Sequence, residues 1–301
     1  IGKYMDDDIQ RIIEGKQLEL GDRELPPFDE YRIYKNIQEA VMREEKRKNR
    51  RIRMPLFFKW TVACAIVLLV IGVGYNFYQS HNEANLVYRE VCAVRGEKLL
   101  VLLPDGSRVW LNADSKLTYP EQFAKYNRNV TLEGEAYFEI AENKKSPFQV
   151  LAENVKIQVT GTCFNVKAYA SDKVIKTTLD EGSINIGHVQ SRRPMQQMLP
   201  GQTAVYEKRS NVIKIKTDRY HDDASSWKSN RLIFRNASLK EVLTTLSRHF
   251  DIEITVKNEK IASFTYDFVC KGNDLNYVLE VMQSITPVSF KKISEYTYTV
   301  E

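Results

Sequence analysis

Cysteine, histidine and tryptophan are scarce in this chain of 301 residues, with four, four and three copies. Four cysteines are too few for a disulfide-dense scaffold, and neither they nor the histidines have the spacing of a metal site. Hydrophobic residues make up 43% of the chain and charged residues 28%. This composition excludes a collagen-like or wholly disordered chain, and the length suggests about two domains.

Motifs that carry catalysis are also absent. The sequence has no GxSxG elbow, Walker A loop, HExxH, EF-hand loop or GxGxxG after a strand. Glu133 and Glu135 lie two residues apart in an extended run, so we expect both on one strand face. A solvated face explains this pair better than acid–base chemistry. We therefore expect a non-enzyme without cofactor or metal.

A strongly apolar stretch without any charge runs from Trp60 to Tyr75. With its apolar flanks it reaches from Leu56 to Tyr78, and a helix of this length spans ~35 Å, enough for a ~30 Å hydrocarbon core. Trp60 and Tyr75 are placed like interfacial aromatic residues. A buried core helix would be shorter, so we predict a transmembrane helix over residues 55–78.

The charges around this stretch indicate its orientation. Residues 41–53 contain seven Lys or Arg and two Glu, whereas no Lys or Arg lies between Gln79 and Tyr88. The positive-inside rule then predicts a single-pass inner-membrane protein with residues 1–54 in the cytoplasm and its C-terminus in the periplasm. A nucleic-acid arm is the alternative for the basic block. Anionic lipid headgroups suffice as its partner, so we expect no direct contact with nucleic acid.

Residues 1–54 contain two helical patterns with few apolar side chains. One pattern follows three aspartates, and the second follows a Pro-Pro break. So small an apolar surface makes a weak core, so this segment either folds on a partner or is a tail before an anchor. The candidate partner-binding residues are Ile9, Ile12, Ile13, Phe28, Tyr34, Ile37 and Val41.

Residues 79–220 read as an all-β domain. Short strand-like runs recur with turn signals between them, among them the Asp105–Gly106 turn of a hairpin. Ile157 and Val159 alternate before Gly161, and Phe164 and Val166 alternate after it, so the chain is expected to change face there. This spacing indicates a sandwich, barrel or β-solenoid.

The period changes in residues 229–301, which we predict to be a small α+β domain. Ser238 begins an S-x-x-E capping box, and a helical apolar face of Leu239, Val242, Leu243, Leu246 and Phe250 follows it. A similar strand–helix–strand unit recurs 36 residues later, with Leu275, Val278, Leu279 and Met282 on the helix. We expect a duplicated βαβ with two helices on one sheet, and an exposed edge at Tyr296–Val300 that could accept a partner strand.

Several motifs in fixed order resemble the FecR family of transmembrane anti-sigma factors. They are LPDGSRVWLNADSKLTY, VTLEGEAYFEI, PFQV, IQVTGTCFNVKAY, LDEGSINI and LPGQ. RLIFRNASLKEVLTTLSRHFDIEITV resembles the domain that follows FecR in Bacteroidota proteins, itself similar to the secretin/TonB short N-terminal domain. The resemblance implies a regulator that binds an extracytoplasmic-function sigma factor inside. Outside, it implies a response to the signalling domain of a TonB-dependent outer-membrane receptor.

The same resemblance implies regulated proteolysis that ends with an intramembrane site-2 protease. Gly161 and Thr162 match the pair at which some family members cleave themselves by an N-to-O acyl shift. A glycine bulge in a strand is the alternative interpretation. Gly72 and Gly74 could loosen the span for the intramembrane cut, although glycine is common in membrane helices. The competing hypothesis for the whole chain is a membrane-anchored periplasmic binding or assembly module without a sigma-factor role.

Overall fold

The computed structural model describes residues 30–48, 61, 64–75, 87–123, 127–191 and 193–301. The chain divides into two compact units, residues 1–78 and residues 79–301.

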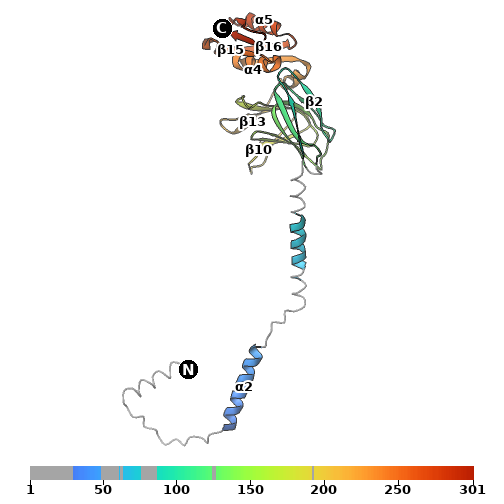
Figure 1. Ribbon diagram of the computed structural model, residues 1–301, viewed down its shortest axis with the longest axis vertical. Coiled ribbons are helices and arrows are strands. Elements are labelled where there is room, and N and C mark those ends of the chain that lie inside the picture. Colours follow the sequence, from blue (N-terminus) through green and yellow to red (C-terminus); the bar gives the residue numbers. More distant parts are fainter. Residues whose placement is uncertain (1–29, 49–60, 62–63, 76–86, 124–126, 192) are drawn as a thin grey trace, which may run out of the picture. The chain divides into compact units, whose positions relative to one another are not determined.

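The first unit contains a helix, α2 (Glu30–Lys48) (Figure 1). Its apolar side chains are exposed: Tyr34 is 67% accessible, Ile37 58% and Val41 52%. The predicted residues Ile9, Ile12, Ile13 and Phe28 lie outside the described residues. The second helical pattern of the sequence is therefore confirmed as a helix, and its apolar residues have no cover within the described part of this unit.

Residues 64–75 are also helical, and every side chain of this stretch is exposed. Among the described residues, no helix is long and apolar enough to cross a membrane. The other parts of the predicted span, apart from Thr61 but including Trp60, lie outside the described residues. Gly72, Gly74 and Tyr75 fall in the helical stretch.

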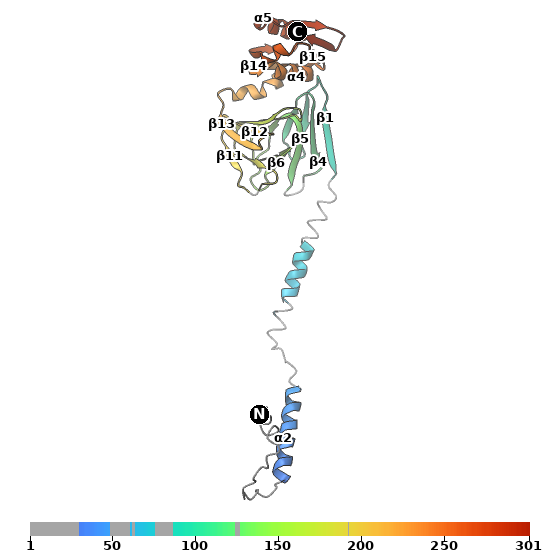
Figure 2. The same ribbon diagram turned by 90° about the vertical axis from the view of Figure 1, so that its left-hand side faces the viewer.

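The second unit begins with a β-sandwich of 13 strands whose two sheets share one long strand, β5 (Figures 1 and 2). One sheet, sheet A, has the order β1-β4-β5-β6-β7-β10-β11, and the other, sheet B, has the order β2-β3-β5-β8-β9-β12-β13. The strands are β1 (Tyr88–Ala93), β2 (Leu99–Leu102), β3 (Arg108–Leu111), β4 (Ser115–Pro120), β5 (Arg128–Glu139), β6 (Phe148–Ala152), β7 (Val155–Val159), β8 (Cys163–Ala168), β9 (Val174–Glu181), β10 (Ile184–His188), β11 (Gln196–Met198), β12 (Gln202–Glu207) and β13 (Val212–Thr217).

Strand β5 changes sheets at Gly134. Its first half pairs with β4 and β6, and its second half pairs with β3 and β8. Gly134 has φ +103°, and a Cβ built there would lie 2.6 Å from the Cα of Ser115. Only glycine combines this backbone conformation with so close an approach of β4. The two sheets enclose one apolar core, in which the rings of Phe138 and Phe164 stack with centroids 5.0 Å apart.

The hairpin predicted at Asp105–Gly106 is confirmed. It joins β2 to β3, Gly106 has φ +83°, and the Leu103 amide donates to the Ser107 carbonyl at 2.9 Å. The predicted change of face at Gly161 is also confirmed. The chain leaves sheet A after β7 and enters sheet B at β8, with Ile157, Val159, Phe164 and Val166 all buried.

A short 3₁₀ helix, η1 (His221–Ser229), follows the sandwich and leads into an α+β part with its own apolar core. The predicted cap is present, because the Ser238 hydroxyl accepts the Glu241 amide at 3.3 Å. The apolar faces of both helices are buried as expected. The elements are β14 (Arg231–Ser238), α4 (Leu239–Phe250), β15 (Glu253–Val256), η2 (Glu259–Ser263), β16 (Thr265–Lys271), α5 (Leu275–Ile285), β17 (Phe290–Lys292) and β18 (Thr297–Val300).

Two expectations for this part are wrong. The strands form two small sheets, β14-β16 and β15-β18-β17, rather than one. The segment Tyr296–Val300 is not an edge, because β18 lies between β15 on one side and β17 on the other. A repeated sequence pattern predicts which residues each strand–helix–strand repeat buries. How the strands pair depends instead on contacts between the two repeats.

Candidate functional site

The outer face of sheet B carries a continuous cross-strand row of side chains. The row runs from apolar to polar across seven strands. Its members are Leu100, Trp110, Tyr137, Asn165, Thr178, Thr203 and Lys216. Such directly opposed residues are close neighbours on one face of a sheet. Helix η1 and the α+β part lie against the middle of this row, so the row forms the floor of the junction between the two parts.

Helix η1 attaches to the row through Trp227 and Lys228. The indole Nε1 of Trp227, which is 7% exposed, donates to Asn165 Oδ1 at 3.1 Å. The Lys228 ammonium lies 3.3 Å from the centroid of the Tyr137 ring and 4.9 Å from that of Trp110. Burial lowers the pKa of Lys228, although Glu139 and Asp180 oppose this shift. The attraction between a cation and the faces of aromatic rings stabilises this position of η1.

A buried carboxylate, that of Glu135, accepts hydrogen bonds from two asparagine side chains. Glu135 is 8% exposed, and its two oxygens accept from Asn112 Nδ2 at 2.9 Å and Asn165 Nδ2 at 3.0 Å. Asn165 thereby connects Glu135 to Trp227, so the β-sandwich and η1 share one hydrogen-bond network. The side-chain polar atoms of Glu135, Asn165 and Trp227 all have hydrogen-bond partners, which is the condition for a buried network to stabilise a structure.

Arg248 of α4 contacts the sandwich through several groups at once. Its Nη2 donates to Ser171 Oγ at 2.7 Å and to Asp172 Oδ1 at 3.0 Å, and its Nε lies 3.6 Å from Asp114 Oδ2. Its guanidinium carbon lies 3.6 Å from the centroid of the Tyr169 ring. The planar guanidinium satisfies carboxylates at its edge and the ring at its face simultaneously, which an ammonium cannot do.

Two further hydrogen bonds join the sandwich to α4 and to η1. The Gly96 amide donates to the Arg248 carbonyl at 2.8 Å, and the Lys98 ammonium donates to the Trp227 carbonyl at 2.7 Å. Burial lowers the pKa of Lys98, while Glu135 partly opposes the shift.

Burial also lowers the pKa of His249, whose Nε2 lies 2.6 Å from the Gly272 carbonyl. A neutral His249 therefore donates to that carbonyl.

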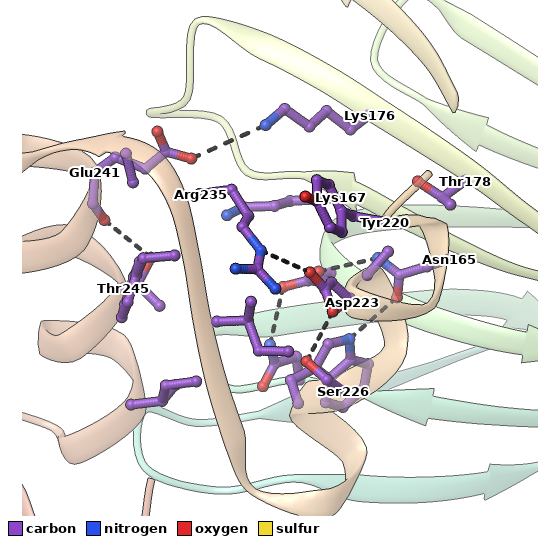
Figure 3. A pocket seen from close by; sticks show the side chains of 18 of the residues that line it. Asn165, Lys167, Lys176, Thr178, Tyr220, Asp223, Ser226, Arg235, Glu241 and Thr245 are labelled. Carbon is purple, nitrogen blue, oxygen red and sulfur yellow. Dashed lines mark hydrogen bonds and ion pairs between the residues drawn. The ribbon is translucent and has the colours of Figure 1, made fainter. Parts of the chain in front are cut away.

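These contacts border a cleft of about 400 Å³ between the sandwich and the α+β part (Figure 3). Two ion pairs lie among its lining residues. Arg235 Nε lies 3.1 Å from Asp223 Oδ2, and Lys176 Nζ lies 4.0 Å from Glu241 Oε1. Its lining offers cations, carboxylates, amides and hydroxyls, and the Thr203 hydroxyl donates to the Asp218 carboxylate at 3.1 Å. Among the described residues no group of His, Cys, Asp and Glu could hold a metal ion. The arrangement is that of a polar joint.

Two segments of the chain match models of protein families. The model of the FecR protein matches residues 90–185, and that of the FecR C-terminal region matches residues 231–300. The two matches together cover more than half of the chain and follow each other in the order of the family. The chain belongs to the FecR family.

Two crystal structures resemble this FecR-family chain. Each is of a protein from Parabacteroides distasonis ATCC 8503 that is provisionally named an anti-sigma factor, at 2.50 Å and 1.65 Å resolution. They are 26% and 25% identical, with TM-scores of 0.66 and 0.65. Each match covers 71% of this chain and 98% of the other. No curated protein matches the sequence of this chain.

The paired acids of the FecR-matched segment do not share surroundings. Glu133 is exposed and lies 3.2 Å from Lys116 on β4, in sheet A. Glu135 is buried in sheet B. The expectation that they lie on one face is wrong, because Gly134 between them turns the strand from one sheet into the other.

Gly161 and Thr162 lie in the connection between β7 and β8 rather than inside a strand. Thr162 is 4% exposed, and its hydroxyl donates to the Ser183 carbonyl at 3.0 Å. A Cβ on Gly161 would lie 2.9 Å from the Cα of Glu142. Close packing therefore accounts for the glycine, and the bulge within a strand that we considered is wrong.

Sequence reasoning missed the residues that form the junction. Arg248 lies among apolar residues of α4. The presence of an arginine within a helix whose apolar face is buried is the one sequence signal that could have indicated a buried partner for it. Asp114 has φ +60°, and the turn-like NADS motif is its sole sequence signal. Trp227 lies between the two family matches, so no motif includes it.

Proposed function

We propose that this FecR-family chain is a single-pass inner-membrane signal transducer. Residues 1–54 bind an extracytoplasmic-function sigma factor in the cytoplasm. Residues 79–301 lie in the periplasm and respond to the signalling domain of a TonB-dependent outer-membrane receptor. The family assignment supports an anti-sigma factor, as do the two Parabacteroides structures that resemble this chain.

The uncovered apolar face of α2 carries the proposal. Tyr34, Ile37 and Val41 are three and seven residues apart, on one side of the helix, and each is more than half exposed. Glu39 and Arg43 form an ion pair at 3.6 Å on the other side. An apolar helical stripe without cover is the usual form in which a helix enters a groove of a partner protein.

The helix over residues 64–75 supports membrane anchoring. Its apolar side chains are exposed all round, from Val67 at 56% to Leu68 at 70%. Exposure of this apolar surface to water costs ~25 cal/mol per Å². A lipid environment removes that cost. The basic residues before it and their absence after it support the orientation.

The junction supports the periplasmic half of the proposal. Arg248 and Trp227 hold the α+β part against the sandwich, so a receptor domain that docks on the α+β part would also act on the sandwich. Signal release by proteolysis belongs to the same proposal, with Gly161–Thr162 as a self-cleavage site and a site-2 protease cutting near Gly72 and Gly74. A fragment that begins at Thr162, detected by mass spectrometry of membrane extracts, would support the first cut.

Capture of a sigma factor tests the proposal. Full-length chain is affinity-purified from its own cells as the wild type, as the variant Tyr34→Asp/Ile37→Asp/Val41→Asp, and as the matched control Glu39→Gln/Arg43→Gln on the opposite face. We expect wild type and control to retain one sigma factor, and the apolar-face variant to lose at least tenfold of it. Equal recovery from all three would contradict the assignment of this face.

An absence of any sigma factor would instead favour an anchored periplasmic binding module. Reporter fusions after residues 54 and 79 test the topology separately. We expect a cytoplasm-active reporter to work only at the first position and a periplasm-active reporter only at the second.

A further inference from the structure

A second cleft, of about 310 Å³, adjoins the cleft of about 400 Å³ described above. The β8–β9 hairpin of the sandwich and α4 with its cap supply its lining. The two clefts share Lys167, Lys176 and Arg248 among their lining residues. A volume of 310 Å³ is at the lower end of the ~300–1,000 Å³ that is typical of small-molecule pockets. The second cleft is therefore large enough for a small molecule.

Lysines dominate the lining of this second cleft, the lysine cleft. Four lysines face two carboxylates in it: Lys167, Lys173, Lys176 and Lys240 against Asp172 and Glu241. Asp172 already pairs with Arg248 at 3.0 Å. Figure 3 shows Lys176 extending toward Glu241, but the two charged groups lie 4.0 Å apart on half-exposed side chains, so this pair contributes little. The other three lysines form no ion pair with any described residue.

Three of these lysines occupy places that are unfavourable for a cation. Lys167 and Lys176 lie directly opposite each other on β8 and β9, where like charges repel. Glu135, the other neighbour of Lys167 in the register, accepts hydrogen bonds from two asparagines and forms no ion pair with Lys167. Lys240 lies in the first turn of α4, at the positive end of the helix dipole. Such uncompensated placements are characteristic of functional sites.

The hydroxyl groups of the lysine cleft add hydrogen-bond donors to this positive charge. The Ser171 hydroxyl accepts from Arg248 Nη2 at 2.7 Å, and the Ser238 hydroxyl accepts from the Glu241 amide at 3.3 Å. Neither hydroxyl donates to another described residue, so the hydrogen of each is left for an acceptor. A ligand with acceptor oxygens and negative charge would complement this lining.

We propose that the lysine cleft binds a small molecule that carries phosphoryl groups. A phosphoryl group presents three acceptor oxygens and more negative charge than a carboxylate, and lysine binds it as a point charge. The bound anion removes the repulsion between Lys167 and Lys176. It also connects α4 with β8 and β9, so the ligand stabilises the junction of the two parts. This site requires neither a sigma factor nor a membrane, and its test is independent of the proposed function.

Calorimetric titration of residues 79–301 with sodium pyrophosphate tests the site. These residues form one compact unit that contains both apolar cores. The variant is Lys167→Gln/Lys176→Gln. The matched control is Lys145→Gln/Lys156→Gln, which removes the same charge from two lysines that line neither cleft and form no ion pair with a described residue. Urea unfolding is measured in parallel, with pyrophosphate and with sodium chloride at equal ionic strength.

We expect the wild type and the control to bind pyrophosphate saturably, and the variant to bind it at least about tenfold more weakly. Pyrophosphate should raise the urea midpoint of the wild type and the control above that in sodium chloride, because a ligand of the folded state stabilises it. Without pyrophosphate the variant should be at least as stable as the wild type, because it lacks the repulsion between the two lysines.

An absence of binding in the wild type would overturn the proposal, and so would equal binding by all three proteins. Sodium citrate that binds as tightly as pyrophosphate would overturn the choice of phosphoryl groups over carboxylates. A variant that unfolds more readily than the wild type without pyrophosphate would also overturn the proposal, since the two lysines would then stabilise the junction by themselves.

Discussion

The guanidinium carbon of Arg248 lies 3.6 Å from the centroid of the Tyr169 ring. Arg248 belongs to α4, and Tyr169 follows β8, so the contact joins the α+β part to the sandwich. The same guanidinium donates to Ser171 and Asp172. The two family-matched segments, residues 90–185 and 231–300, thus meet at this buried side chain.

Replacing Arg248 should loosen this junction. Arg248→Ala leaves Asp172 without its partner in a place where water reaches poorly, so we expect a loss of about 3 kcal/mol in unfolding free energy. Calorimetry of residues 79–301 should show the α+β part unfolding at lower temperature than the sandwich. The control Arg231→Ala, at the exposed start of β14, should change stability by less than about 0.5 kcal/mol. A single unshifted transition in Arg248→Ala would contradict this role.

The buried pair of Arg128 and Asp105 should matter more than the exposed pair of Arg108 and Glu139. The Arg128 side chain is 4% exposed; it donates to the Asp105 carboxylate and, at 2.9 Å, to the Ser146 carbonyl. Arg128→Met removes the donor to both acceptors. We therefore expect urea denaturation to show a loss of about 3–5 kcal/mol in unfolding free energy. Arg108→Met removes a pair that is 57% exposed on the arginine side and should cost less than about 1 kcal/mol. Similar losses in the two variants would refute the ranking.

Gly134 should tolerate no side chain. Gly134→Ala adds a Cβ only 2.6 Å from the Ser115 Cα at a backbone φ of +103°. We expect insoluble protein, or a loss above about 3 kcal/mol, because strain and overlap add. Gly106→Ala is the matched control, since its φ of +83° is similar but a Cβ there meets open space. That variant should lose about 1–2 kcal/mol. Soluble yield and urea midpoints distinguish the two.

His249 should make stability fall in mild acid. Burial lowers its folded-state pKa below the ordinary value of 6.5, so the unfolded chain binds the proton more readily. Its contribution is complete above pH 6.5 and is lost as the pH falls through the folded-state pKa. We expect the wild type to lose more unfolding free energy between pH 7 and pH 5 than His249→Gln, which keeps a donor near the Gly272 carbonyl. Parallel pH profiles for the two proteins would contradict this assignment.

Local patterns determined much of this protein. The Asp105–Gly106 turn, the Ser238 cap, the apolar face of α4 and the change of sheet at Gly161 each depend on residues close together in the chain. Turn chemistry, capping and side-chain period operate at that range, so they can be predicted from the sequence. The order of the FecR motifs could be recognised for the same reason.

Tertiary structure alone decided the pairing of distant strands and the junction. The sequence could not show that β18 lies in the middle of its sheet, or that Gly134 sends Glu133 and Glu135 to different sheets. It also could not bring Arg248 to Tyr169, 79 residues earlier, or Trp227 to Asn165. Burial of a charged or polar side chain becomes favourable only when a partner is already in place. That partner is supplied by the packing of the whole unit, and no local pattern records it.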